Sequence, residues 1–148
     1  LRDFFLLLHK HTEKIQPETF HFLVAGMNPH AGEEGLFGSE EEEEILPAIN
    51  HAKKEGVRIS GPFPPDVVFR KALNHPDKIV IALYHDQGLI PFKLEAFEKG
   101  VNTTLGLPFI RTSPTHGTAF DIANKRTANP ESMVEAIKLA YELSPRFL

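Results

Sequence analysis

Lys78-Ile-Val-Ile-Ala-Leu-Tyr-His-Asp-Gln-Gly-Leu89 is the stretch of sequence that decides the fold. It opens as an apolar run rich in β-branched residues and stops at a His-Asp pair, with Gly88 close behind. A run of this kind predicts a buried parallel strand over 79–83. In open α/β sheets, reactive groups lie in a crevice at the carboxyl ends of such strands. The stretch therefore predicts an α/β fold with functional residues just after this strand.

A second stretch, Phe20-His-Phe-Leu-Val-Ala-Gly-Met-Asn-Pro-His30, repeats the pattern. It predicts a strand over 20–25 that continues through Gly26 into a tight turn carrying His30. Two strand ends that each present an imidazole suggest a shared metal or catalytic site.

Composition indicates one soluble, enzyme-type domain with small-molecule partners. The chain has 148 residues, is 41% hydrophobic and has a formal net charge of −4. Its Lys and Arg residues are spread thinly, which argues against a nucleic-acid or membrane surface. Cysteine is absent, so any metal must bind imidazole, carboxylate or water.

Location and completeness are further expectations from the sequence. No signal peptide and no membrane-length apolar run is visible in the sequence, since a spanning helix needs about 20 apolar residues. The expected location is the cytoplasm. The chain starts at Leu1, without Met and directly in a helical pattern, so we expect residues before Leu1 to be missing.

Five helical segments are predicted from periodicity, caps and breakers. An amphipathic helix is expected over 1–14. Ser39 and Glu42 form a capping-box pattern for a helix that kinks or breaks at Pro47 and ends at Gly56. Its acidic run, 40–44, is interpreted as a solvated helix start, with an acidic binding patch as the alternative. The remaining helices are expected over 66–73, from Pro91 to Glu98, and after Asn129-Pro130, the last with Met133, Val134, Ile137, Ala140 and Tyr141 on one face.

Shorter strands are expected over 57–60 and 101–105, and the Pro-rich segment 61–65 is expected to lack regular structure. Strands and helices alternate without an internal repeat or a linker. This order predicts one three-layer α/β/α unit over residues 1–148.

His30 and His85 are the candidate metal ligands. Each is expected just after a buried strand and beside residues that let a ligand approach, Asn28-Pro29 in one case and Gly88 in the other. Neutral imidazole suits Zn²⁺ or Co²⁺, and a catalytic site commonly uses three protein ligands with one open position. Asp86 either takes part in this site or is a turn carboxylate that accepts backbone hydrogen bonds. The histidines without such a context are interpreted as surface or packing residues: His9, His11, His21, His51 and His75.

Longer motifs carry a resemblance to a known family. They are Asn28-Pro-His-Ala-Gly-Glu, Tyr84-His-Asp-Gln-Gly-Leu, the run from Gly100 to Ser113, and His116-Gly-Thr-Ala. Together they resemble the C-terminal half of the 4-hydroxythreonine-4-phosphate dehydrogenase family, enzymes of pyridoxal phosphate biosynthesis. The resemblance covers nearly the whole chain. It implies an isocitrate/isopropylmalate dehydrogenase-like α/β/α fold and a homodimer with its active site at the subunit interface.

The resemblance also implies which residues form the site. The family's metal site uses three histidines, of which two correspond to His30 and His85. The third, with a His-Thr pair that contacts substrate, belongs upstream of Leu1. Lys93, Asn102 and Arg111 correspond to substrate-binding positions, and a cation, an amide and a guanidinium fork suit a substrate with phosphate and carboxylate groups. Without the family match, Lys93 is equally well a solvated helix residue, and Asp66 is either a helix N-terminal charge or a carboxylate supporting the site.

The implied reaction is oxidation and decarboxylation of 4-phosphohydroxy-L-threonine to 3-amino-2-oxopropyl phosphate. The implied cofactors are NAD or NADP and a divalent metal (Zn, Mg or Co). No Gly-x-Gly-x-x-Gly motif is present, so the nicotinamide rests on the resemblance. Alternatives are a related dehydrogenase of another phosphorylated hydroxy acid and a non-catalytic fragment.

Two positions depart from the family pattern. Thr115 stands where Asp commonly precedes His-Gly-Thr, and Asn124-Lys-Arg126 stands where a Gly-rich turn is common. These departures concern a loop expected near the cofactor, and they leave the metal and anion residues untouched.

Overall fold

The computed structural model describes residues 1–16 and 20–146. The chain divides into two compact units, Leu1–Leu89 and Ile90–Leu148. The sequence predicted a single unit and did not anticipate this division. Its physical origin is that the strands form two separate sheets, one of three strands and one of two.

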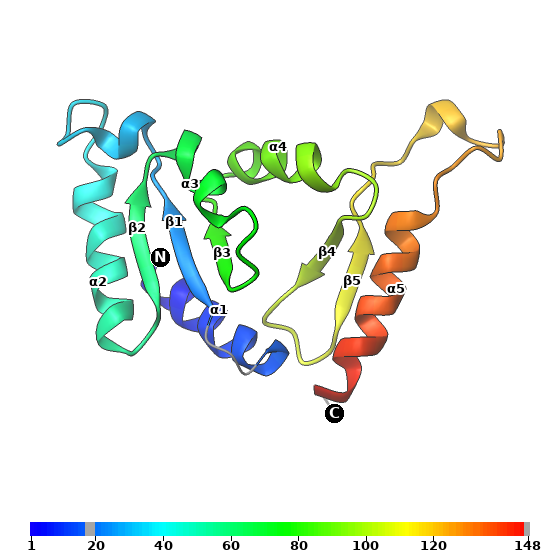
Figure 1. The fold of residues 1–148 in the computed structure, drawn as a ribbon, viewed down its shortest axis with the longest axis horizontal. Helices are drawn as coiled ribbons and strands as arrows, with labels where there is room; N and C mark the ends of the chain where they lie inside the picture. Colours follow the sequence, from blue (N-terminus) through cyan, green and yellow to red (C-terminus); the bar gives the residue numbers. More distant parts are fainter. Residues whose placement is uncertain (17–19, 147–148) are drawn as a thin grey trace. The chain divides into compact units, whose positions relative to one another are not determined.

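The first unit is built on a parallel sheet of β1 (His21–Ala25), β2 (Ile59–Phe63) and β3 (Lys78–Ile81). Figure 1 shows β1 between its two neighbours, in the order β2-β1-β3. The β1–β3 register runs from His21 opposite Lys78 to Val24 opposite Ile81. Both strands therefore end at the same edge of the sheet, as the two apolar runs predicted.

Helices cover both faces of this sheet. Phe22 and Val24 of β1 pack with Phe5 of α1 (Arg2–Ile15) and Ile49 of α2 (Leu46–Lys54). The alternate residues Leu23 and Ala25 pack with Val68 of α3 (Pro65–Ala72) on the opposite face. Since successive strand residues point to opposite faces, the predicted three-layer α/β/α arrangement is confirmed.

The helix that begins near Ser39 changes its geometry at Pro47. A π-helical segment, η2 (Glu41–Ile45), runs directly into α2, which has a proline in its first turn. The predicted kink or break at Pro47 is not seen as an interruption, because the backbone stays helical from Ile45 through Leu46 and only the hydrogen bonding changes, from π to α. The predicted capping box is wrong, because the backbone carbonyl of Ser39, rather than its hydroxyl, accepts the N–H groups of Glu42 and Glu43.

The segment predicted to be irregular, 61–65, contributes to the sheet instead. Gly61, Pro62 and Phe63 form the end of β2, with a cis peptide between Gly61 and Pro62. β2 lies at the edge of the sheet, where a proline is tolerated because its missing N–H faces no partner strand. Gly61 has φ +138°, and a Cβ there would lie 2.6 Å from the carbonyl oxygen of Val24.

The helix predicted to start at Pro91 starts six residues earlier. β3 ends at Ile81, and α4 runs from His85 to Ala96 with Pro91 inside it. Pro91 lacks the N–H that would bond to the carbonyl of Gln87, yet the helix continues. His85 and Asp86 therefore belong to the first turn of a helix rather than to the end of a strand.

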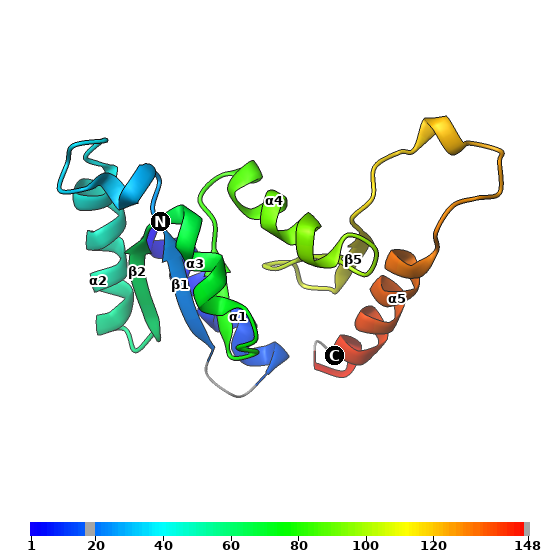
Figure 2. The same cartoon turned by 45° about the horizontal axis from the view of Figure 1, so that its top comes forward.

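The second unit contains β4 (Val101–Thr104) and β5 (Arg111–Pro114), which pair antiparallel. α5 (Glu131–Leu143) packs on them, and the Thr112 hydroxyl donates a 2.8 Å hydrogen bond to the carbonyl of Ala136. Figure 2 shows the long connection from β5 to α5, which carries the short η3 (Phe120–Ile122). A short η4 (Ser144–Arg146) follows α5.

The predicted apolar face of α5 is largely exposed. Met133, Val134, Ile137 and Tyr141 are 42–81% exposed, whereas Ser132, Ala136 and Leu143 are buried. The buried side of α5 is therefore made by Ser132, Ala136 and Leu143 instead. Among the helices of the described residues, none is both long and apolar enough to cross a membrane.

Candidate active site

His30 lies in a tight turn at the carboxyl end of β1. The turn, η1 (Pro29–Gly32), has left-handed backbone angles at His30 (φ 54°) and Ala31 (φ 55°), and Glu33 and Glu34 also have positive φ. Such angles are uncommon for residues other than glycine. A run of them is held by surrounding contacts rather than by local preference.

Glu41 supplies those contacts from the start of η2. Its side chain is buried, and one carboxylate oxygen accepts the backbone N–H of Asn28 at 2.7 Å. The other oxygen accepts the Asn28 side-chain amide at 2.9 Å. The same amide also donates to Glu40 at 2.6 Å. The residue that starts the His30 turn is thus fixed by charge-assisted hydrogen bonds.

The ionisation of Glu41 reflects this environment. Burial on its own would raise the pKa of this carboxyl. Burial is the largest single effect, but the hydrogen bonds from Asn28, together with those from the backbone of Glu41 and Met27, outweigh it and hold the pKa of Glu41 below its ordinary value. Glu41 is therefore a buried carboxylate, so the solvated interpretation of the acidic run is wrong for this residue and holds for the exposed Glu42, Glu43 and Glu44.

Gly32 lets the turn come close to that carboxylate. Its φ is +86°, and a Cβ at this position would lie 2.8 Å from a carboxylate oxygen of Glu41. Any side chain at position 32 would push the two apart.

His85 is the first residue of α4 and is exposed. It follows β3 as His30 follows β1, so both imidazoles extend from one edge of the parallel sheet. Asp86 is also exposed in the first turn of α4, where the helix dipole favours a carboxylate.

The ends of β1 and β3 are joined by the side chain of Gln87. This residue is only 7% exposed. Its amide nitrogen donates to the carbonyl of Gly26, and its amide oxygen accepts the N–H of Leu83, each at 2.7 Å.

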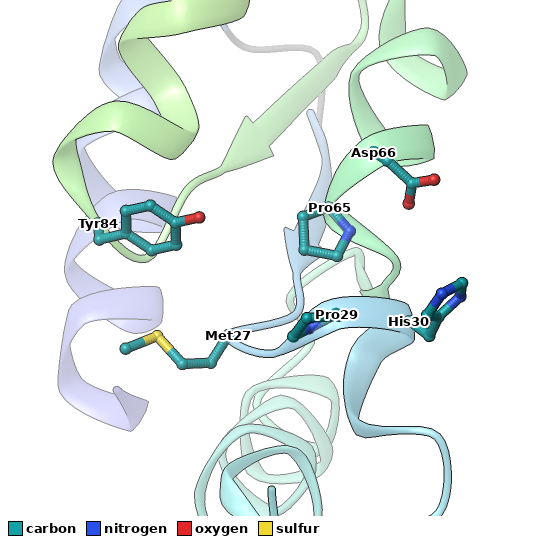
Figure 3. Close-up of a pocket in the computed structure, with 6 residues that line it drawn as sticks. All are labelled: Met27, Pro29, His30, Pro65, Asp66 and Tyr84. Carbon is teal, nitrogen blue, oxygen red and sulfur yellow. The ribbon is translucent and has the colours of Figure 1, made fainter. Parts of the chain in front are cut away.

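A pocket of about 230 Å³ opens beside His30. Figure 3 shows His30 and Asp66 on one side and Tyr84 and Met27 on the other, with Pro29 and Pro65 between them. Asp66 lies in the first turn of α3. The two interpretations of Asp66 are compatible, since this helix-start carboxylate also lines the pocket.

Two imidazoles at one edge match the donor chemistry of a zinc or cobalt site, but they are an incomplete set. Among residues 1–16 and 20–146, no group of three or more His, Asp or Glu side chains is placed to hold a metal ion. A metal on His30 and His85 would need a further ligand from another part of the protein.

His21, interpreted from the sequence as a surface or packing residue, is engaged at the opposite edge of the sheet. Its Nε2 lies 2.8 Å from the Ser60 hydroxyl. Burial, followed by the positive charges of Arg58 and Lys78, lowers the pKa of His21.

Asn102 and Arg111 lie on one face of the β4–β5 ladder. Arg111 is opposite Thr104 and donates to its hydroxyl at 2.9 Å, and Asn102 is two residues before Thr104. Thr112, on the other face, bonds to α5. The two predicted anion-binding side chains thus share the face that α5 does not cover, and both are exposed.

Lys93 is exposed on α4 within the second unit. The structure therefore assigns the two candidate metal ligands to the first unit and the three candidate substrate residues to the second.

Thr115, the departure from the family pattern, has a structural partner. Its hydroxyl donates to the carbonyl of Gly100 at 3.4 Å, and its N–H donates to the hydroxyl of the buried Ser132 at 3.1 Å. The Ser132 hydroxyl in turn donates to Gly100 at 2.7 Å. These bonds tie the end of β5 to α5.

The family model described as "Pyridoxal phosphate biosynthetic protein PdxA" matches residues 1–140. The chain belongs to the PdxA family. Its relatives include a 4-hydroxythreonine-4-phosphate dehydrogenase of Desulforapulum autotrophicum, which is 61% identical over 117 residues, 79% of this chain and 34% of the relative. A D-threonate 4-phosphate dehydrogenase of Salmonella typhimurium is 57% identical over 121 residues, 82% of this chain and 37% of the relative.

Solved PdxA structures share the fold. The 4-hydroxythreonine-4-phosphate dehydrogenase of Klebsiella pneumoniae matches with a TM-score of 0.82 at 45% identity, over 96% of this chain and 43% of that one. The predicted family and fold class are confirmed. The chain spans 34–43% of the length of these PdxA relatives.

Several residues of the candidate site were missed by sequence reasoning. Met27, Pro65 and Tyr84 line the pocket, and Glu41 and Gln87 bond to the backbone beside the two histidines. Gln87 could have been noticed as the polar residue next to the His-Asp pair. Nothing distinguishes Glu41 from its four acidic neighbours before the fold is known.

Proposed function

We propose that this chain is the C-terminal part of an NAD(P)-dependent, metal-requiring dehydrogenase of phosphorylated hydroxy acids. The relatives are dehydrogenases by name. The observation that carries the proposal is the placement of His30 and His85 after neighbouring parallel strands. This edge is where α/β enzymes bind their ligands.

The first candidate substrate is 4-phosphohydroxy-L-threonine. Its C3 alcohol would lose a hydride to NAD⁺ or NADP⁺ and a proton to solvent, which gives a β-keto acid. The bond between C2 and the carboxylate then breaks, CO₂ leaves, and the electron pair stays on C2 as an enolate. Protonation of C2 gives 3-amino-2-oxopropyl phosphate.

His30 and His85 would hold the divalent metal, Zn²⁺, Co²⁺ or Mg²⁺. When bound, such an ion supplies Lewis-acid chemistry that favours loss of the alcohol proton and polarises the ketone. Both imidazoles are reachable by a ligand: His85 is exposed and His30 lines the pocket.

The active protein in this proposal is a homodimer, because the two imidazoles need a third ligand. We propose that the partner subunit contributes to the same site. The exposed apolar face of α5 supports association, since large apolar patches on a protein surface mark interaction sites.

Lys93, Asn102 and Arg111 would bind the phosphate and carboxylate groups of the substrate. Arg111 already presents its guanidinium on the exposed face of the β4–β5 ladder, held there by Thr104. A guanidinium can bind two anionic oxygens at once, whereas Lys93 offers a point charge.

D-threonate 4-phosphate is the second candidate substrate, because a relative with 57% identity bears that name. The two substrates differ at C2, where one has an amino group and the other a hydroxyl group. The phosphate, the carboxylate and the oxidised C3 alcohol are shared. His30, His85 and Arg111 would therefore serve both.

The test is to purify the intact natural polypeptide and follow reduction of NAD⁺ and NADP⁺ with each substrate. The proposal expects turnover with at least one of them, loss of turnover after removal of divalent metal, and recovery on adding Zn²⁺, Co²⁺ or Mg²⁺. The ratio of kcat/KM values for the two substrates identifies the preferred one. Unchanged turnover after complete metal removal would refute the metal requirement, and no turnover with either substrate would refute the proposed reaction.

A further inference from the structure

Gln87 bridges the ends of β1 and β3 just beyond the point where their ladder stops. The last paired residues of the two strands are Val24 and Ile81. Gly26 and Leu83 lie two residues beyond that pair, and each bonds to the Gln87 amide. The side-chain amide thus joins the two strand ends where backbone pairing has ended.

Gly26 is bonded on both of its backbone groups. Its N–H donates to the carbonyl of Phe63 in β2 at 2.7 Å, and its carbonyl accepts the Gln87 amide at 2.7 Å. The Gln87 amide makes one hydrogen bond to each strand end, so it fixes the distance between them.

Each strand end leads to one of the two histidines. Gly26 is four residues before His30, and Leu83 is two residues before His85. Gln87 is itself two residues after His85, in the first turn of α4. A buried amide with two short hydrogen bonds has little freedom to move. Substitution of Gln87 should therefore alter the backbone conformation beside both His30 and His85.

Glu41 provides the contrast. Its carboxylate accepts hydrogen bonds from the residues just before His30, chiefly Asn28, so it constrains the turn of His30 and not that of His85. Substitution of Glu41 and substitution of Gln87 should therefore have different effects.

We infer that Gln87 is a positioning residue that sets the separation of His30 and His85. The inference rests on the proposed function, in which these two imidazoles act together. The residue touches neither substrate nor metal and acts through the two turns that its amide joins.

The first test needs no metal. In the intact natural polypeptide with ¹³C-labelled histidine, the ring signals of His30 and His85 are assigned by substitution of each residue. Gln87→Met, which keeps the length of the side chain and removes both bonds, should shift the signals of both residues. Glu41→Gln should shift His30 alone. The exposed Gln16 offers a matched control, and Gln16→Met should shift neither.

The second test is a titration with Co²⁺ that follows its visible absorption bands. Gln87→Met should weaken Co²⁺ binding by at least about tenfold and change the band positions, since supporting residues around metal ligands commonly contribute that much. Gln87→Glu keeps the acceptor for Leu83 and loses the donor to Gly26, so it should fall between wild type and Gln87→Met.

The outcomes separate the two proposals. Wild-type protein that binds no Co²⁺ counts against the proposed metal site, while the histidine signals still test Gln87. Shifts confined to one histidine in Gln87→Met would overturn the positioning role even where Co²⁺ binds. If Gln87→Met does not fold, Gln87→Glu and protection of the Leu83 amide from hydrogen exchange in the wild type take its place. A Leu83 amide that exchanges as fast as an open loop would overturn the inference.

Discussion

The two units bury their apolar residues to different extents. In the first unit, the sheet is covered on both faces, and Phe5, Phe22, Val24, Ile49 and Val68 are at most 1% exposed. In the second unit, Ala136 and Leu143 are the buried apolar residues among those described, while Leu94, Phe97, Ile137 and Tyr141 are at least 63% exposed. The first unit has a core of its own, whereas the second presents apolar side chains that its own residues do not cover.

The same contrast runs through the candidate site. His30 and His85 follow strands of a buried parallel sheet. Glu41 and Gln87 hydrogen-bond to the backbone next to them. Two of the proposed anion-binding residues, Asn102 and Arg111, lie on an exposed two-stranded ladder, where Thr104 alone holds Arg111 among the described residues. We expect loss of a candidate metal ligand or of a core side chain in the first unit to have larger effects than the matched changes in the second.

The largest expected effect is on turnover when a candidate metal ligand is removed. His85→Ala in the intact polypeptide should lower kcat/KM by more than about 100-fold, because even residues that only support a ligand contribute 10–100-fold. Steady-state kinetics with the preferred substrate would measure it. His75 is exposed and has no role in the site, so His75→Ala is the control and should retain wild-type kinetics. Similar activity in both variants would remove His85 from the site.

The next effect compares the two units with one matched substitution. Ile49→Ala in α2 should lower the free energy of unfolding by about 2–5 kcal/mol, because it leaves a cavity in a closed core. Ile137 is 63% exposed on α5. Ile137→Ala should change the free energy of unfolding by no more than about 0.5 kcal/mol. Urea denaturation would give both values. A large and concentration-dependent loss for Ile137→Ala would show that a second molecule covers this face.

A smaller effect is expected for the guanidinium of Arg111, which we propose binds an anionic group of the substrate. Arg111→Lys keeps the charge but loses the paired N–H donors of the guanidinium. It should lower kcat/KM by the equivalent of about 1–3 kcal/mol. Arg70→Lys, at an exposed position on α3, is the matched control and should leave kcat/KM unchanged. Equal kinetics for the two variants would place Arg111 outside the site.

The smallest effect concerns pH. The folded-state pKa of Glu41 is below its ordinary value of 4.5, so its stabilisation is fully present above that value and is lost as the pH falls through the folded-state pKa. At neutral pH, Glu41→Gln should lower the free energy of unfolding by about 1–2 kcal/mol, and this difference should shrink in acid. The exposed Glu43 is the control, and Glu43→Gln should behave as wild type throughout. A difference that is constant with pH would contradict the ionised bond to Asn28.

Much of this architecture could be predicted from the sequence, and the failures have identifiable physical causes. The two β-branched runs predicted the strands β1 and β3 and the sheet edge that His30 and His85 follow. They could do so because a buried strand is recognisable from its own short, apolar sequence. Pro91 misplaced the start of α4, since a proline was assumed to begin a helix that in fact contains it. The end of β2 was missed because Pro62 lies on an edge strand, a fact that depends on the order of the strands.

The supporting residues of the site depend on tertiary contacts that no local pattern encodes. Gln87 and Gly26 are 61 residues apart in the chain. Glu41 differs from Glu42 and Glu43 only in facing the turn at Asn28. The division of the chain into two units was missed for the same reason, because the pairing of β4 with β5 rather than with the parallel sheet is decided by long-range contacts.

The left-handed backbone at His30 has a consequence for folding. Four residues of this segment other than glycine, His30, Ala31, Glu33 and Glu34, have positive φ, and each such angle disfavours the turn in an unfolded chain. We therefore expect the turn to form only when Glu41 of η2 bonds to it. The orientation of the His30 imidazole then belongs to the folded state alone. Any ligand that binds His30 in this orientation would select folded molecules, and it would raise the melting temperature in proportion to the logarithm of its concentration above Kd.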